Sequence, residues 1–285
     1  MSDINYACSL GSLCHSSQLL KRNKYKLSSY PFDWIFSNEN NIIHCIKDDF
    51  KIFLDKSYYI NVSQSICGHS YYDKNMFNHF NPLMNIEHYN YYVRCVDRFK
   101  DLLKKSEHKL FIMIFINRES TSNANNADIL KQNIIEFNNE FSKYTSNYTL
   151  LVIIHHPNKS QNHHKFTYND NIHFLDLDTL SISGGVQFKN NNDNIYLDNI
   201  LNSHYKFNVK RDAMQKGNQQ EMQKRRPNQQ EMQKRRRNQQ EMQKRRRIQQ
   251  EIQKRIRNQQ EIQKRIRIQQ EMQKRRRIQK EIMYY

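Results

Sequence analysis

Three continuous apolar runs, separated by segments of helical periodicity, limit what this chain can fold into. The runs are Leu110–Ile116, Tyr148–Ile154 and Ile172–Leu177, and none of them alternates apolar with polar residues. Strands of this kind are covered on both faces of their sheet. Amphipathic helical segments lie between such runs, and this order is typical of parallel sheets. The pattern therefore predicts an α/β domain with a layered, mostly parallel sheet flanked by helices.

The helical segments follow from apolar residues spaced three and four apart. They predict helices from about Asn38 to Leu54 and from about Glu87 to Lys105, and a third over Leu130–Tyr144 that Asp128 helps to cap. The region Ser63–Phe80 predicts an added strand or hairpin that carries His79.

The composition is rich in Asn, Ile, Lys and Tyr, residues with AT-rich codons, so part of the bias reflects the genome. The Asn-rich stretches Asn123–Asn126 and Asn190–Asn194 are therefore predicted to be loops.

Cys14 stands where a nucleophile would be favoured. Tyr6–Leu10 predicts a short buried strand, Gly11-Ser12 breaks it, and a helix opens near His15. A thiol in the first turn of a helix faces unpaired N–H groups and the positive end of the helix dipole. Both favour the thiolate, which is the nucleophilic form. The alternative is a small side chain that fills core space.

Five blocks of the sequence occur in an order that is characteristic of one family. They are Ser9–Cys14, Pro31–Trp34, Phe77–Phe80, the Tyr- and Arg-rich segment Tyr89–Phe99, and the apolar run Leu110–Ile116. The chain resembles a family described as papain-like cysteine peptidases, a domain family of bacteria and amoeba-infecting giant viruses. The resemblance covers about residues 5–120 well and 120–207 loosely.

The resemblance implies a thiol-dependent hydrolase, peptidase or acyltransferase with a Cys-His centre. Cys14 would be the nucleophile and His79 the general base, and later the general acid, acting on a peptide or acyl substrate without a cofactor. The acidic residue that the pattern places beside the histidine is absent, since Phe80 and Asn81 follow His79. A papain-like enzyme has a helical half and an antiparallel half, whereas the periodicity here favours a layered α/β sheet. We use periodicity for the architecture and the resemblance for the position of the centre.

Position along the chain offers a second base and further acids. His155 follows Tyr148–Ile154, so in a parallel sheet it would emerge at the same edge as Cys14, and Asp176 could orient it. Asp33, between two aromatic residues, is either a buried hydrogen-bond acceptor or part of the centre, and the structural role is favoured.

Two histidine pairs raise the question of a metal site. His155-His156 and His163-His164 are six residues apart across a polar loop and have no cysteine nearby, so no dedicated metal site is predicted. Five cysteines without a Cys-x-x-Cys pair favour a reducing compartment. No signal peptide or membrane span is apparent, so we expect an intracellular protein, cytoplasmic or nuclear.

The C-terminal part is a basic repeat of a different character. A ten-residue unit recurs from Asn218, and residues 218–285 hold 22 basic and 7 acidic residues, a net charge of +15 out of +18 for the whole chain. We predict an α/β domain over 1–207, a linker over 208–217, and a tail over 218–285 that forms a long charged helix or is partly disordered. One apolar residue per ten rotates around a helix, which disfavours a strong coiled coil.

A cationic tail of this density suits phosphate contacts. It has no aromatic residue before Tyr284, so any binding of nucleic acid would be non-specific; a repeat without a partner is the equal alternative. The second hypothesis for the whole chain is thus a non-catalytic α/β binding protein tethered to nucleic acid by this tail. The residues expected to contact phosphates are Lys234, Arg235, Arg236, Arg237, Lys244, Arg245, Arg246 and Arg247.

Overall fold

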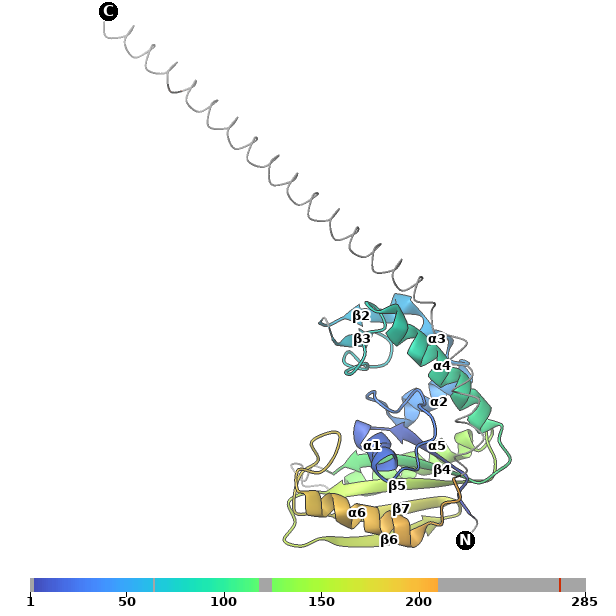
Figure 1. The fold of residues 1–285 in the computed structure, drawn as a ribbon, viewed down its shortest axis with the longest axis vertical. Helices are drawn as coiled ribbons and strands as arrows, with labels where there is room; N and C mark the ends of the chain where they lie inside the picture. Colours follow the sequence, from blue (N-terminus) through green and yellow to red (C-terminus); the bar gives the residue numbers. More distant parts are fainter. Residues whose placement is uncertain (1–2, 64, 118–124, 210–271, 273–285) are drawn as a thin grey trace, which may run out of the picture. The chain divides into compact units, whose positions relative to one another are not determined.

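The structure of the protein is a computed structural model that describes residues 3–63, 65–117, 125–209 and 272 (Figure 1). The elements, in chain order, are β1 (Tyr6–Gly11), α1 (Cys14–Arg22), α2 (Glu39–Lys47), α3 (Lys51–Leu54), a 3-10 turn (Lys56–Tyr58), β2 (Tyr59–Asn61), β3 (Cys67–His69), α4 (Ile86–Leu103), β4 (Lys109–Ile116), α5 (Asn125–Phe141), β5 (Tyr148–His156), β6 (His163–Asn169), β7 (Ile172–Asp178) and α6 (Asn191–His204).

A central sheet with the strand order β1-β4-β5-β7-β6 organises the domain (Figure 1). The pairs β1–β4, β4–β5 and β5–β7 are parallel, and β6 pairs antiparallel to β7 at one edge. A separate antiparallel hairpin joins β2 to β3. The predicted layered, mostly parallel α/β architecture is confirmed.

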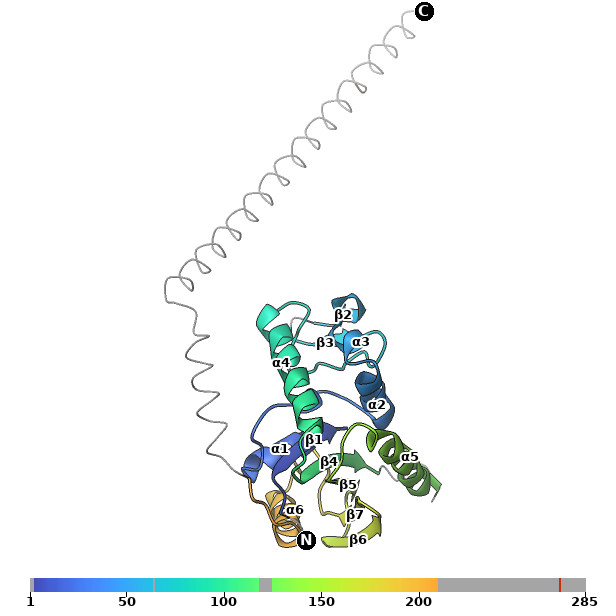
Figure 2. The same cartoon turned by 90° about the vertical axis from the view of Figure 1, so that its right-hand side faces the viewer.

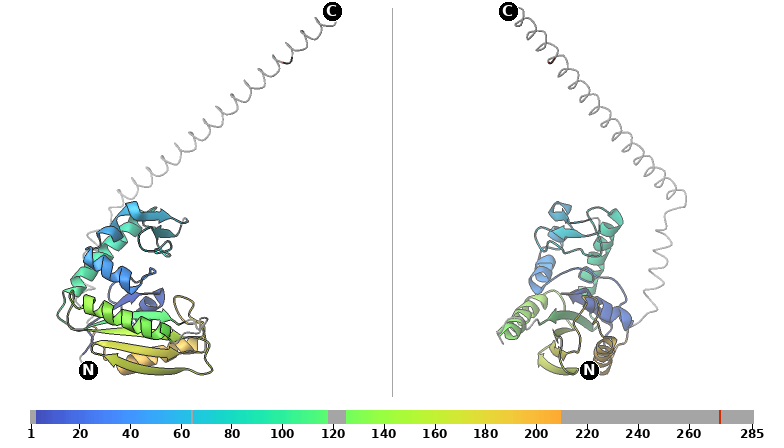
Figure 3. Two further views of the ribbon diagram at one scale, coloured as in Figure 1. Left: turned by 180° about the vertical axis from the view of Figure 1, so that it is seen from behind. Right: turned by 90° about the vertical axis from the view of Figure 1, so that its left-hand side faces the viewer.

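Both faces of the sheet are covered because its strand residues alternate between two cores. From β4, Phe111 and Met113 enter the core formed with α2, α4 and α5, whereas Leu110 and Ile112 enter the core formed with α1 and α6. Seen nearly edge-on, α1 and α6 lie on one side of the sheet and α5 on the other (Figure 2). Seen from behind, α5 runs across the sheet (Figure 3, left). Because these strands are buried on both faces, their sequences are continuous apolar runs.

Two sequence-based predictions of local structure are wrong. The helix predicted over Asn38–Leu54 is broken between α2 and α3, because Asp49 and Phe50 adopt left-handed backbone conformations (φ 55° and 61°). The Asn-rich stretch Asn190–Asn194 is not a loop: Asn190 accepts a hydrogen bond from the N–H of Asn192 as the N-cap of α6. Asn is among the best N-cap residues, so a run of Asn marks a helix start as well as a loop.

The strand β6 has no counterpart among the predicted elements. Its residues are polar and largely exposed, with His163, His164 and Lys165 among them, so periodicity gave no sign of burial. The edge strand β6 is held by its backbone pairing to β7, and a hydropathy pattern does not reveal such pairing. The hairpin predicted in Ser63–Phe80 begins earlier, at Tyr59, and His79 lies beyond its second strand.

The chain divides into two units, Met1–Met214 and Gln215–Tyr285, and in the second the structure describes Met272, which is exposed. The predicted tail and the eight phosphate-contacting residues named above therefore lie outside the described residues. The boundaries at 207 and 217 stay predictions.

Candidate active site

Cys14 is positioned by the turn between β1 and α1. Gly11 has φ +95°, and a Cβ there would collide with the Ser37 side chain, so glycine is required. The Ser12 hydroxyl then donates to the carbonyl of Ile114 at 2.7 Å, which ties the turn to the neighbouring strand. Leu13 is the extended N-cap, and Cys14, 3% exposed, is the first residue of the helix. The thiol therefore lies at the helix N-terminus, as the sequence predicts.

His79 is positioned by the segment that follows the β2–β3 hairpin. Phe77 pairs with Cys67 of β3 through two backbone hydrogen bonds of 3.2 and 2.9 Å, and its buried ring packs against Tyr92 of α4. Two residues further on, Asn81 donates from its side chain to the carbonyl of Ser63 at 3.0 Å. These anchors on both sides hold His79, whose own side chain is exposed.

The structure brings the two predicted residues into contact. Cys14 Sγ and His79 Nε2 are 3.3 Å apart, although 65 residues separate them in the chain. An imidazole at this distance can accept the thiol proton through Nε2 when its other nitrogen carries the ring proton. A Cys-His pair of this geometry can therefore form a nucleophilic thiolate.

Burial dominates the electrostatics of the thiol. It raises the pKa of Cys14 to about 11, against the N–H of Cys14 itself and the side chain of Asn78, whose hydrogen bonds lower it. The N–H group at the helix start favours the thiolate, as expected, but desolvation of the charged form outweighs the local donors. A thiol with a pKa this high is protonated at neutral pH unless a base takes its proton.

Asn78 is a member of the site that the sequence analysis did not identify. Its side chain makes the hydrogen bond that lowers the pKa of Cys14. Its Oδ1 atom is buried and has no hydrogen-bond partner among the described residues. The signal available in the sequence was its position directly before His79. A side-chain amide there can donate a hydrogen bond, which a carboxylate cannot do.

Asp33 does not contact the imidazole. Its buried carboxylate accepts hydrogen bonds from the backbone N–H of Tyr30 at 2.7 Å and from the ammonium of Lys26 at 2.5 Å. Burial raises the pKa of Asp33, while the Lys26 ammonium lowers it. The next residue, Trp34, does reach the centre: its ring lies edge-on to that of His79, with centroids 5.8 Å apart. Asp33 thus closes the turn that presents Trp34.

The alternative base is in a different environment. His155 is 0% exposed, its Nε2 is hydrogen-bonded to the hydroxyl of Thr179 at 2.7 Å, and burial lowers its pKa to about 4. Asp176 does not orient His155, because the side chains of these two residues point to opposite faces of the sheet. Instead, Asp176 pairs with His156 at 3.4 Å and with Lys131 at 3.1 Å on the face covered by α5.

The histidine pairs considered for metal binding diverge. His163 faces Asp178 at 3.7 Å, and His164 bonds to the hydroxyl of Tyr196 at 2.7 Å, whereas His155 and His156 have the partners given above. Over the described parts of the chain, no three His, Cys, Asp or Glu side chains are grouped so as to hold a metal ion. The five cysteines are free thiols.

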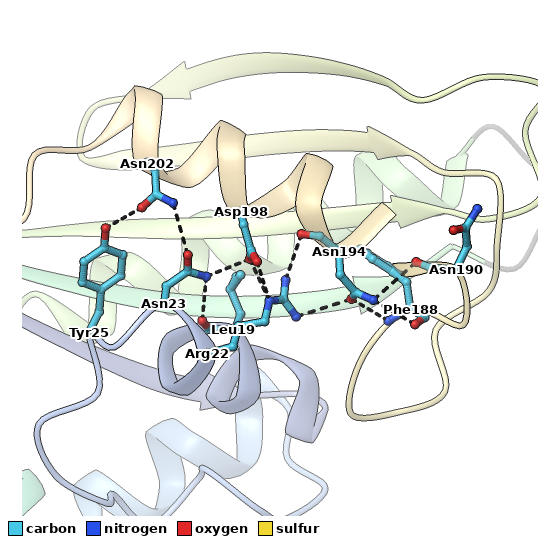
Figure 4. Close-up of polar contacts among 9 residues, drawn as sticks. All are labelled: Leu19, Arg22, Asn23, Tyr25, Phe188, Asn190, Asn194, Asp198 and Asn202. Carbon is cyan, nitrogen blue, oxygen red and sulfur yellow. Dashed lines mark hydrogen bonds and ion pairs between the residues drawn. The ribbon is translucent and has the colours of Figure 1, made fainter. Parts of the chain in front are cut away.

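A polar network fixes the other end of α1 to α6 (Figure 4). The Arg22 guanidinium donates through Nε to both carboxylate oxygens of Asp198, at 2.7 and 2.9 Å. Asn23 donates to Asp198 at 2.7 Å and to the Leu19 carbonyl at 3.0 Å, which closes the helix C-terminus. Because α1 is only nine residues long, an anchor at Arg22 restrains the helix that begins at Cys14.

Among the described residues, no helix is both long enough and apolar enough to cross a membrane.

Comparison with known proteins identifies one family. Residues 5–158 match the family described as "Putative papain-like cysteine peptidase (DUF1796)". Searches of curated proteins and of solved structures each returned no match. The matched segment contains β1, the Cys14 turn, Trp34, His79 and strands β4 and β5, and it spans more than half of the 285 residues. The chain therefore belongs to this papain-like cysteine peptidase family.

Proposed function

We propose that the protein is a thiol-dependent hydrolase or acyltransferase acting on a peptide or another acyl substrate. Cys14 is the nucleophile, and His79 is the general base and then the general acid. The observation that carries the proposal is the 3.3 Å contact between Cys14 Sγ and His79 Nε2. Family membership supports the same reaction class.

The proposed reaction conserves atoms and charge at each step. As the sulfur of Cys14 bonds to the substrate carbonyl carbon, its proton passes to His79 Nε2 and the carbonyl electron pair moves onto oxygen. When the carbonyl re-forms, the bond to the leaving amine or alcohol breaks and His79 returns its proton to that group. Water, or an acceptor amine or alcohol, then attacks the thioester while His79 takes its proton, and the thiol is restored.

Two donors near the sulfur suit the negative charge that develops on the carbonyl oxygen. The N–H of Cys14, at the start of α1, and the Asn78 side chain both donate toward the sulfur. Donors held in place before the reaction stabilise such charge without reorganisation. The buried thiol, the imidazole and these donors together support acyl transfer chemistry.

Selective alkylation of the full-length protein tests the proposal. We expect iodoacetamide at neutral pH to modify Cys14 faster than Cys8, Cys45, Cys67 or Cys95, because all five thiols are buried and the sulfur of Cys14 has an imidazole beside it. p-Nitrophenyl acetate should leave an acetyl group on Cys14, detectable by mass spectrometry of the digested protein. His79→Gln should lose both, and His164→Gln, a matched change at a distant imidazole bonded to Tyr196, should lose neither. Equal alkylation of all five thiols in the wild type would refute the proposal.

The basic repeat supports a separate proposal about partners. We propose that residues 218–285, and within them Lys234–Arg237 and Lys244–Arg247, bind nucleic acid phosphates without sequence preference. Binding of duplex DNA by the full-length protein should then fall steeply with salt, and a chain ending at Asn208 should lose it. Equal binding by the two chains would contradict this role.

A further inference from the structure

In the described parts of the chain, no acidic side chain is bonded to the imidazole of His79, which raises the question of which other group holds the ring. The described contacts of His79 are the thiol of Cys14 and the ring of Trp34. In other Cys-His centres a carboxylate or amide fixes the imidazole through a hydrogen bond. Here the neighbouring amide, Asn78, is bonded toward the sulfur instead. Of the described contacts of His79 other than the thiol, the ring of Trp34 is the one that can orient the imidazole.

Trp34 is itself held by a buried cation. The ammonium of Lys26 lies 4.9 Å from the centroid of the Trp34 ring, and that of Lys21 lies 6.0 Å away. A cation over the face of an indole is attracted to the negative charge of the ring face. The imidazole of His79 meets the same ring at an interplanar angle of 76°, an edge-to-face arrangement that aromatic pairs prefer.

Lys26 also ties this ring to the helix of the nucleophile. The side chain of Lys26 is 10% exposed, and its ammonium donates to Asp33 Oδ2 and to the hydroxyl of Ser17, both at 2.5 Å. Ser17 lies one helical turn after Cys14 in α1. One ammonium thus joins the α1 helix, the turn that carries Trp34, and the ring that touches His79.

We propose that Trp34, backed by the Lys26–Asp33 ion pair, is the positioning group for His79 and takes the place of the missing acid. The inference rests on the proposed function of Cys14 and His79. It gives Asp33 a role that does not require contact with the imidazole: Asp33 neutralises the buried ammonium that holds the ring. Lys26, Asp33 and Trp34 are therefore positioning residues, and Cys14 and His79 are the catalytic pair.

Trp34 is the only tryptophan of the chain, so its fluorescence reports this contact directly. Protonated imidazole quenches indole emission on contact. We expect the emission of the wild-type protein to fall as pH is lowered, and we expect that change to disappear in His79→Gln and persist in His164→Gln. The charged groups around the ring are Lys21, Lys26 and His79, together with Asp33, which is paired with Lys26. An unchanged pH profile in His79→Gln would overturn the proposed contact.

The effect on reactivity separates positioning from folding. Lys26→Met and Trp34→Leu should each slow alkylation of Cys14 at neutral pH by about 10-fold, as expected when a catalytic group is misplaced. The conservative variants Lys26→Arg and Trp34→Phe should retain most of the rate, because they keep the charge and the ring. The loss should shrink as pH rises, since the thiol then ionises without help from His79. A folding defect would instead expose the five buried thiols and speed their alkylation together.

The outcomes also distinguish this inference from the proposed function. If His79→Gln slows alkylation of Cys14 but the folded Lys26→Met and Trp34→Leu proteins react at the wild-type rate, the catalytic pair stands and the positioning role is wrong. If His79→Gln itself has no effect, the proposed function fails first. Should Trp34→Leu not fold, the comparison of Lys26→Met with Lys26→Arg, together with the fluorescence titration, still decides the question.

Discussion

Two imidazoles illustrate how differently this domain treats the same side chain. His79 is exposed and lies 3.3 Å from the Cys14 thiol, whereas His155 is fully buried and bonds to the Thr179 hydroxyl at 2.7 Å. His155 comes at the end of the parallel strand β5, where α/β domains often place functional groups. His79 comes from an irregular segment beyond a hairpin.

Two consecutive residues of α1, Cys14 and His15, face the environments of these two imidazoles. Cys14 faces His79, and the next residue, His15, packs edge-on against Phe188 with centroids 4.5 Å apart. Phe188 also packs against His155 at 4.6 Å. Successive helical residues point about 100° apart, so one helix end serves both environments. Strand position alone does not make an imidazole reactive; what it faces decides its chemistry.

The largest expected effect comes from replacing each of the two histidines with glutamine, in separate variants. His79→Gln should lower the rate of Cys14 acetylation by p-nitrophenyl acetate by about 100-fold or more, the usual contribution of a general base. His155→Gln should change that rate far less and should instead lower the free energy of unfolding, by roughly 1–3 kcal/mol for a disturbed buried hydrogen bond. Acetylation rates and denaturant unfolding of both variants measure the two effects. A larger loss of rate in His155→Gln would reverse the assignment of the base.

The pH dependence of Cys14 alkylation sharpens the role of His79. Burial raises the pKa of the thiol to about 11, so without a base its reactivity should climb with pH toward that value. In His79→Gln the rate should increase about tenfold per pH unit through the neutral and mildly alkaline range. In the wild type it should be higher at neutral pH and depend less on pH. Parallel profiles for the two proteins would mean that His79 does not assist ionisation.

Acid unfolding tests the role of the buried histidines. Burial lowers the pKa of His15 to about 3 and that of His155 to about 4, from an ordinary value of 6.5. Groups whose pKa is lowered in the folded state stabilise it above the ordinary value, and this contribution is lost as pH falls toward the folded value. The free energy of unfolding should therefore decline between about pH 6.5 and 3.

The slope of that decline identifies the groups. His15→Gln should make the acid loss shallower, because one buried imidazole no longer has to take up a proton. His164→Gln, at a more exposed imidazole, serves as the matched control. An equally steep acid loss in His15→Gln and the wild type would show that the buried histidines do not govern acid stability.

The smallest expected effect concerns the anchor at the far end of α1 (Figure 4). Arg22→Met should lower the free energy of unfolding by about 1–2 kcal/mol, as expected for a partly buried ion pair in which Arg22 Nε donates to both oxygens of Asp198. Alkylation of Cys14 should slow only slightly, since Ser12 still ties the start of the helix to β4. Lys143→Met, which breaks an exposed pair with Glu140, is the control and should be nearly neutral. Equal stability of the two variants would remove the anchoring role of Arg22.

The sequence predicts the architecture where side-chain burial leaves a pattern. The runs that form β4, β5 and β7 are apolar on both faces because two cores need them, and this pattern is visible without coordinates. The burial pattern does not predict features that depend on backbone geometry, such as the break at the left-handed residues Asp49 and Phe50. It also fails at β6, an edge strand whose pairing to β7 leaves its side chains exposed.

By itself, the sequence determined a two-faced parallel sheet and a cysteine between its first strand and a helix. Together with the family resemblance it also singled out His79. The tertiary structure alone decided that His79, not His155, meets the thiol, and that Asp33 pairs with Lys26 while the ring of Trp34 contacts the imidazole. It also decided that burial raises the pKa of Cys14. The physical reason is that local patterns specify elements and faces, whereas contacts across 65 residues and the desolvation of a thiol depend on how the whole domain packs.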